Sequence, residues 1–272
     1  MSLFLLACTA DPSTEDAATL AECTATVADD VPAFFATYFA CTDISMEGDN
    51  VVLATDSLPP YATYYYGADH EMYAEWDDQG GETSPNPSTI EALTVRVVVP
   101  ADPVARGLDI TAARVDHQMG TSDEEYVAGS VGVAPDSVAN FNATAAPGDD
   151  IFEEELTFDE WDAHPTPNGE YHHHGANRGA LAALDFLGVD ATVFGVMCDG
   201  TVLLGCDELD GSAVDIDTLD AQDGHVGDIV DLDGTVHFSG RYHAHVCAHY
   251  NGFGLYPEIQ YYDDCDSAPA VP

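Results

Sequence analysis

The sequence has almost no positive charge. Its 272 residues include 5 Arg and no Lys, against 50 Asp and Glu, so the formal net charge at pH 7 is -45. Nucleic-acid binding and polybasic docking to anionic lipid both depend on Lys and Arg, so this composition argues against both kinds of partner. Acidity of this degree is typical of a solvated, salt-tolerant surface, as in marine or halophilic secreted proteins.

Several common functional motifs are also missing. No segment approaches the ~18 consecutive apolar residues of a membrane span. The chain has no C-x-x-C pair, no G-x-S-x-G nucleophile elbow, no phosphate-binding loop and no dinucleotide fingerprint. The acidic segments 215–224 and 231–234 are predicted to be solvated turns, because a calcium loop starting at Asp215 would place Leu219 where an oxygen ligand is needed.

The first residues predict export. Residues 1–8 read MSLFLLAC and resemble a bacterial lipobox, which makes Cys8 the expected lipidation site, although the usual positive n-region is missing and the match could be accidental. Residues 9–29 would then be an acidic tether, and residues 30–272 the folded domain. The expected location is extracytoplasmic, either lipid-anchored at the bacterial cell envelope or secreted, with the membrane contacted only through the lipid.

The remaining cysteines agree with export. Without Cys8 there are six, an even number that suits a disulfide framework. Pairing the nearest neighbours predicts the disulfides Cys23–Cys41, Cys198–Cys206 and Cys247–Cys265.

The chain reads as one mainly β domain. Short runs rich in β-branched residues at 93–99, 126–133, 192–196 and 201–204 are bounded by turn residues and predict strands. Helices are expected within 30–42 and over 176–187, the latter ending at Gly188. The prediction is a single antiparallel β domain, sandwich or barrel-like, with long loops.

An ordered set of three motifs occurs twice. Residues 131–174 and 194–245 each contain G-V-x-x-D, then D-x-H, then G-x-Y-H-x-H. The same order in both copies predicts a duplicated β unit arranged about a pseudo-twofold axis.

These motifs resemble those of the YHYH domain family. Its signature stands here as YHHH at 171–174 and YHAH at 242–245, with the second Tyr replaced by His173 and Ala244. Segments 56–61, 64–66, 85–87, 196–200 and 219–225 resemble its other landmarks, so the likeness covers roughly 50–262. The resemblance implies no particular reaction.

The paired histidines predict a transition-metal site. Side chains at i and i+2 of a strand share one face, and a third imidazole from each D-x-H element completes a three-His set with an open fourth position. Zinc and copper both suit imidazole. The predicted ligands are His164, His172, His174, His225, His243 and His245, in two groups or in one shared centre. The side chains expected to orient them are Asp162, Asp199, Asp223, Tyr171 and Tyr242.

Other histidines and aromatics have weaker signals. His173 should face away from the ligands, and His237 is a reserve ligand if its strand runs through Gly240 in phase. His70, His117 and His249 follow no pattern. The tyrosines at 64–66 are expected to pack on the sheet, with a carbohydrate or peptide surface as the alternative.

Two functions remain open from the sequence. The favoured one is a non-catalytic metal-binding or structural module, because no general base or nucleophile stands out beyond the ligands. The alternative is a metal-dependent extracytoplasmic hydrolase or oxidoreductase with a three-His zinc or copper centre. An open, solvent-reached coordination position would favour the second.

Overall fold

The computed structural model describes most of the central chain. It covers residues 25–77, 83–111, 120–121, 129–142, 144–145, 150–246 and 261–263. Cys8, Cys23, Cys247, Cys265, His117 and His249 lie outside these residues, and so do parts of the predicted tether and of the 126–133 run. Within the described residues, no helix combines the length and apolar character that crossing a membrane requires.

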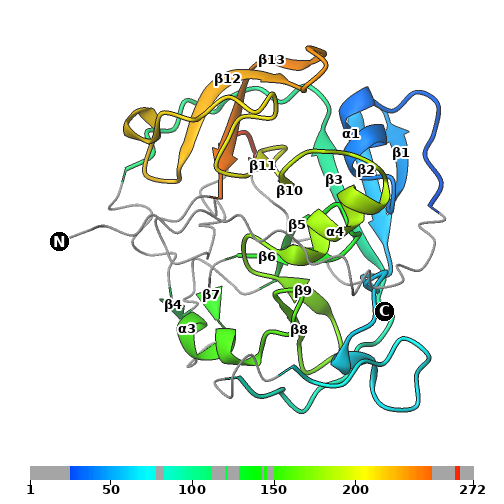
Figure 1. Ribbon diagram of the computed structural model, residues 1–272. Helices are drawn as coiled ribbons and strands as arrows, with labels where there is room; N and C mark the ends of the chain where they lie inside the picture. The colour runs from blue at the N-terminus through cyan, green and yellow to red at the C-terminus, as the bar shows by residue number, and fades with distance from the viewer. Residues whose placement is uncertain are drawn as a thin grey trace.

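One eight-stranded sheet forms the body of the molecule, and it is mixed rather than purely antiparallel (Figure 1). Its order is β12-β13-β11-β10-β5-β6-β9-β8. The strands are β5 (Ser130–Val133), β6 (Ala139–Phe141), β8 (Ala163–Pro165), β9 (Tyr171–His173), β10 (Val193–Met197), β11 (Val202–Leu204), β12 (Gly224–Val230) and β13 (Val236–His245). The order does not close on itself in the described residues, so of the two expected architectures the sandwich-like one is found.

The sheet consists of two equivalent halves, which confirms the predicted duplication. Antiparallel pairing of β5 with β10 joins them, and outward from this centre each half has one antiparallel, one parallel and one antiparallel pairing. The registers also correspond, because His164 faces His172 across β8 and β9 while His225 faces His243 across β12 and β13. The two units are therefore related by an approximate twofold axis between β5 and β10.

Each repeated motif has a structural role. The Asp of G-V-x-x-D closes the turn between two strands, since Asp136 Oδ1 accepts the Val138 N–H and Asp199 Oδ1 accepts the Thr201 N–H. The Gly of that motif lies where strands approach closely: a Cβ on Gly132 would come 2.5 Å from the Val196 carbonyl oxygen.

The remaining motif residues connect the outer strands. The Asp of D-x-H has a left-handed backbone in both copies, with φ of 63° at Asp162 and 56° at Asp223, a conformation Asp tolerates better than most residues. The motif tyrosines also match, because Tyr171 donates to Asp159 at 2.6 Å and Tyr242 donates to Asp220 at 2.8 Å.

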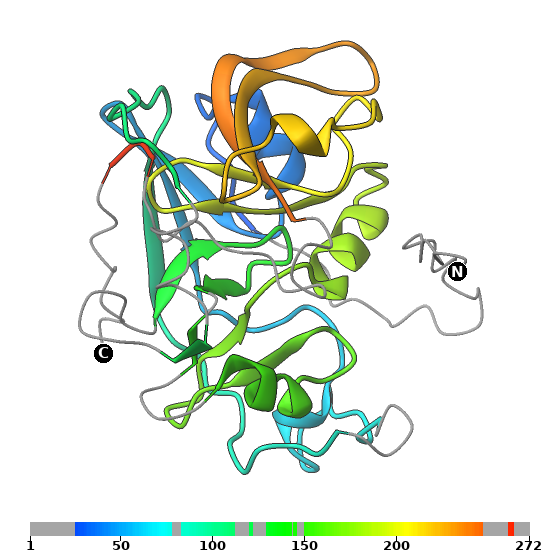
Figure 2. The same cartoon turned by 90° about the vertical axis from the view of Figure 1, so that its left-hand side faces the viewer.

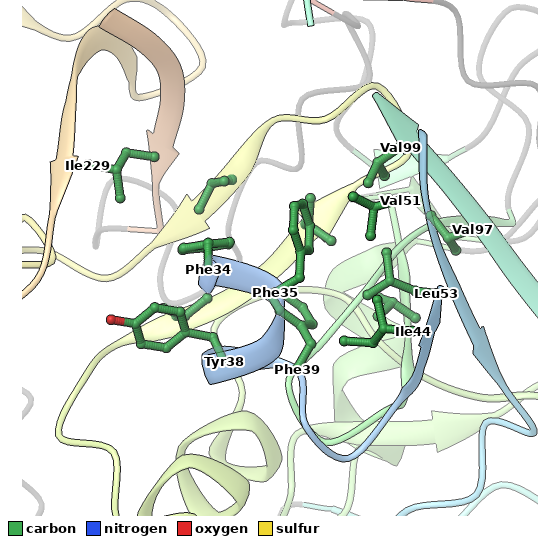
Figure 3. Close-up of a cluster of buried hydrophobic side chains, with 14 of the residues drawn as sticks. Phe34, Phe35, Tyr38, Phe39, Ile44, Val51, Leu53, Val97, Val99 and Ile229 are labelled. Atoms are coloured by element: carbon green, nitrogen blue, oxygen red, sulfur yellow. The ribbon is translucent and has the colours of Figure 1, made fainter. Parts of the chain in front are cut away.

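A smaller sheet packs against the large one through the main core. It has the order β1-β2-β3 and consists of β1 (Asp43–Glu47), β2 (Asn50–Thr55) and β3 (Val95–Pro100). The helix α1 (Ala33–Tyr38) contributes aromatic side chains to this core, and Figure 3 shows Phe35 between Phe34 on one side and Val51 and Val99 on the other. Residues of both sheets share the cluster, as expected for a sandwich-like domain.

The other elements are short. They are η1 (Tyr64–Tyr66), α3 (Ile151–Glu154), η2 (Glu155–Thr157), α4 (Arg178–Phe186), η3 (Ile216–Thr218) and the parallel pair β4 (Gly120–Thr121) and β7 (Thr144–Ala145). The helix α4 begins at the Asn177 cap, whose side chain accepts the Ala180 N–H, and its chain turns away at Gly188 as predicted. The tyrosines of η1 pack inward, with Tyr65 fully buried.

One predicted disulfide is wrong. Cys206 is a free thiol whose Sγ lies 3.9 Å from the Val246 carbonyl oxygen, so it does not pair with Cys198. Cys206 follows β11 and is held beside the end of β13, a placement that sequence separation does not reveal. The other two predicted pairs each involve a residue outside the described part of the chain.

Candidate metal centres

The predicted histidines gather in two groups at opposite ends of the large sheet. The first centre consists of His164, His172 and His174, and the second of His225, His243 and His245 with Glu208. Figures 1 and 2 place β8–β9 and β12–β13 at opposite ends of the molecule. The path from β9 to β13 crosses five strand spacings. At ~4.8 Å each, the centres lie about 24 Å apart, so one shared centre is not possible.

In the first centre three Nε2 atoms point at one another. His172 Nε2 lies 3.1 Å from His164 Nε2 and 2.9 Å from His174 Nε2. The i, i+2 spacing puts His172 and His174 on the same face, and the antiparallel β8 brings His164 directly opposite His172. All three side chains are buried.

The other ring nitrogens of this centre determine the tautomers. His172 Nδ1 lies 3.0 Å from the Glu170 carbonyl oxygen, and His174 Nδ1 lies 2.7 Å from the Asn142 carbonyl oxygen. His164 Nδ1 lies 2.6 Å from Thr157 Oγ1, whose own hydrogen goes to the Glu154 carbonyl. Each acceptor requires an N–H at Nδ1, so a neutral ring leaves its Nε2 without a hydrogen.

Burial keeps these three rings neutral. Desolvation, together with the neighbouring imidazoles, lowers the pKa of His164 and His172 well below the ordinary value. Desolvation also lowers the pKa of His174 to about 4, although the hydrogen bond to Asn142 opposes the shift. Three lone pairs therefore meet away from water with no hydrogen between them, an arrangement that a bound cation would stabilise.

The second centre contains the equivalent three histidines and adds a carboxylate. His225 Nε2 lies 3.1 Å from His245 Nε2 and 3.0 Å from Glu208 Oε1, while Glu208 Oε2 lies 3.2 Å from His243 Nε2. Burial favours the protonated acid, but the hydrogen bond and charge of His243 and the charges of the other two imidazoles lower the pKa of Glu208. The centre therefore presents three imidazoles and an ionised carboxylate.

The Nδ1 acceptors of the second centre occupy equivalent positions. His243 Nδ1 lies 3.0 Å from the Arg241 carbonyl oxygen, two residues earlier, as His172 does with Glu170. His245 Nδ1 lies 2.9 Å from the carbonyl oxygen of Gly205, just after β11. Desolvation lowers the pKa of His245 to about 4. Both units thus orient their paired histidines with main-chain carbonyls.

Four of the five side chains expected to orient the imidazoles bond to other groups. Tyr171 and Tyr242 donate to Asp159 and Asp220. The Asp162 carboxylate pairs with Arg178, and Asp199 accepts hydrogen bonds from Thr201 and Tyr262. The carbonyl oxygen of Asp223 accepts the His245 N–H, which fixes the backbone beside this ligand.

Of two further histidines, one lies as the sequence predicts and the other does not. His173 faces away from the first centre, as predicted, and its Nε2 lies 2.9 Å from the buried Asp136. His237 is not a ligand, because Gly240 has a φ of 61° and interrupts the alternation along β13. Its Nε2 lies 3.1 Å from Asp231, and its ring packs against Phe34 of α1.

Glu208 was not identifiable from the sequence. It is one of 50 acidic residues and lies 17 positions before His225, with no fixed spacing to the histidine motifs. A hydrogen bond from the Glu208 N–H to the Ser212 carbonyl forms a tight turn after β11, which brings its carboxylate to the three imidazoles.

The two centres also differ in their surroundings. The first lines a cavity of about 450 Å³, and all three of its histidines contribute to the wall. The other lining residues are Asn86, Pro87, Ser88, Phe141, Glu153, Glu154, Thr157, Pro165, Thr166 and Pro167. The nearest carboxylate oxygen, Glu154 Oε2, is 3.9 Å from His174 Nε2. The first centre therefore has three close nitrogen donors, whereas the second has three nitrogens and an oxygen.

Both sets of atoms are compatible with a small metal ion. Two zinc–nitrogen bonds of ~2.0–2.1 Å at a tetrahedral angle place the nitrogens about 3.3 Å apart. The Nε2 separations of 2.9–3.1 Å require these pairs of rings to open by only a few tenths of an ångström.

Comparison with known proteins gives one match. Residues 110–222 match the family model described as YHYH protein. The match includes all three histidines of the first centre and ends before His225. No curated protein and no solved structure matches the chain.

Proposed function

The chain is a YHYH family protein over residues 110–222, and we propose that it binds two transition-metal ions, zinc or copper, one in each duplicated unit. The observation that carries this proposal is the first centre, where the buried His172 Nε2 lies 3.1 Å from His164 Nε2 and 2.9 Å from His174 Nε2. The Nδ1 atoms of the three rings donate to fixed acceptors. Without a cation, the three lone pairs repel one another among buried side chains.

The donor atoms favour this class of metal. Calcium and magnesium take oxygen ligands, whereas neutral imidazole suits zinc and copper. The acidic chain, with its formal charge of -45, also raises the local concentration of cations.

The principal role we propose is a binding or structural module. In the first unit a metal would join β8 to β9 and, through the His174 bond to Asn142, to the end of β6. In the second it would join β12, β13 and the turn that carries Glu208. Within the described sheet, β8 and β12 are the edge strands and have a neighbour on one side only. Such a crosslink would fasten each of them to the next strand of its half.

The proposed setting is outside the cytoplasm. The lipobox-like MSLFLLAC and the acidic composition support an envelope-anchored or secreted protein. Metal-dependent catalysis remains the second candidate function, favoured by the cavity at the first centre.

Metal analysis tests the proposal. Protein purified without a His tag, loaded with zinc and dialysed, should hold two ions per chain by mass spectrometry of the metal. The variants H172A/H174A and H243A/H245A should each hold one. The matched control His70→Ala removes an exposed histidine outside both centres and should keep two. Two ions in either double variant, or none in the wild type, would refute the proposal.

Stability gives a second measurement. A ligand at about 100 times its Kd adds ~2.7 kcal/mol per site to the free energy of unfolding, provided that only the folded state binds it. Zinc should therefore raise the melting temperature of the wild type about twice as much as that of either double variant.

A further inference from the structure

The two centres contain equivalent histidines but have different fourth neighbours. At the second, Glu208 Oε1 and Oε2 lie 3.0 and 3.2 Å from His225 and His243, so the carboxylate occupies the position of a fourth ligand. At the first, the closest carboxylate oxygen belongs to Glu154 and is 3.9 Å from a single imidazole. The cavity of about 450 Å³ lies on this side of the first centre.

We propose that the first centre is an open metal site that binds a small exogenous molecule in this cavity, while Glu208 closes the second. This rests on the proposed metal binding and adds that the units have diverged, one to a ligand-binding role and the other to a structural one. A closed site with four protein ligands is typical of structural zinc, and three protein ligands with one position left for a ligand are typical of reactive zinc.

The cavity wall defines the class of ligand. Phe141, Pro87, Pro165 and Pro167 provide apolar surface, which suits a small molecule with an apolar body. Among the lining residues there is no Arg or Lys, and Glu153 and Glu154 add negative charge. The two glutamates offset the positive charge of a bound divalent ion, so the cavity offers an anionic phosphate or carboxylate little net attraction.

The ligand that fits is neutral, with one nitrogen or oxygen donor for the metal. Glu154 is placed to accept a hydrogen bond from an N–H or O–H of the same molecule, because its carboxylate is beside His174 and also lines the cavity. It is a positioning residue, and the metal itself is held by the three imidazoles.

Cobalt-loaded protein provides the test, with pyridine as a neutral aromatic probe and acetate as an anionic one. In the wild type, isothermal titration and the cobalt absorption spectrum should show one pyridine bound per chain. Acetate should bind about tenfold more weakly than pyridine. In Glu208→Ala, which opens the second centre, two pyridines should bind per chain.

Variants with a single centre assign the response. H243A/H245A, which retains the first centre, should keep the pyridine-dependent spectral change, and H172A/H174A should lose it. The proposal would be overturned by a pyridine-dependent change in H172A/H174A only, or by two pyridines bound per wild-type chain. It would also be overturned if cobalt bound at both centres and its spectrum did not respond to pyridine. Absence of cobalt binding would instead refute the proposed metal function on which it rests. If a double variant does not fold, the wild-type stoichiometry against Glu208→Ala still decides the question.

Discussion

Removal of the His173 imidazole should destabilise the protein strongly even without metal. Both ring nitrogens donate, Nε2 to Asp136 at 2.9 Å and Nδ1 to the Asp162 carbonyl at 3.1 Å. Burial opposes the charged ring, but the attraction and hydrogen bond of Asp136, helped by Asp162, raise the pKa of His173. At pH values below this raised pKa, His173 and Asp136 form a fully buried ion pair, with side chains 0% exposed.

The structure sets the expected magnitude. Breaking a buried pair by removing one partner costs about 3–5 kcal/mol, because the other charge remains buried and uncompensated. In His173→Ala, Tyr61 and the Val138 N–H still donate to Asp136, at 2.9 and 3.2 Å, which places the loss toward the lower end of that range. At about 2–4 °C per kcal/mol, the melting temperature should fall by roughly 6–15 °C.

The assay is urea unfolding in the presence of EDTA, so that metal bound by the adjacent His172 and His174 does not contribute. The variant H173A/D136N removes the stranded charge and should be more stable than His173→Ala alone, whereas two unrelated losses would add. The exposed control His70→Ala should lose less than about 1 kcal/mol. A loss below about 1 kcal/mol in His173→Ala, or additive losses in the double variant, would refute the ion-pair account.

Two further predictions concern the fold. Gly132→Ala should lower the free energy of unfolding in urea by about 1–3 kcal/mol, because the new Cβ would meet the Val196 carbonyl oxygen at 2.5 Å. Gly129→Ala is the control, because a Cβ there would have nothing within 4 Å. Equal losses in the two variants would contradict the close approach at Gly132. Burial raises the pKa of Asp159 to about 6, against hydrogen bonds from Thr63, Tyr171 and Trp161. The protonated Asp159 carboxyl therefore contributes about 3 kcal/mol to the free energy of unfolding. This contribution is fully present below about pH 4 and is lost as the pH rises through 6. The side chain in Asp159→Asn cannot titrate. In urea unfolding, the stability of this variant relative to the wild type should therefore increase by about 3 kcal/mol between pH 3.5 and pH 7. Parallel pH profiles of the two proteins would contradict the raised pKa of Asp159.

The sequence by itself determined the mainly β class, the duplication and the six histidines that face one another. These depend on local rules: a period of two aligns His172 with His174, and a motif order repeated twice requires two similar units. The turn residues were equally local, since Asp136 and Asp199 close their turns with bonds two residues away.

Only the tertiary structure decided how many centres exist and how they differ. The order of the sheet puts β9 and β13 five strand spacings apart, which separates the histidines into two groups. Glu208 reaches the second group through a turn with no sequence signature, and the cavity of the first is assembled from segments as distant as Asn86 and His174. Cys206 remains a thiol for the same kind of reason, because pairing depends on where the chain returns in space. A sequence pattern records which side chains share a strand face, whereas contacts between distant segments depend on the packing of the whole domain.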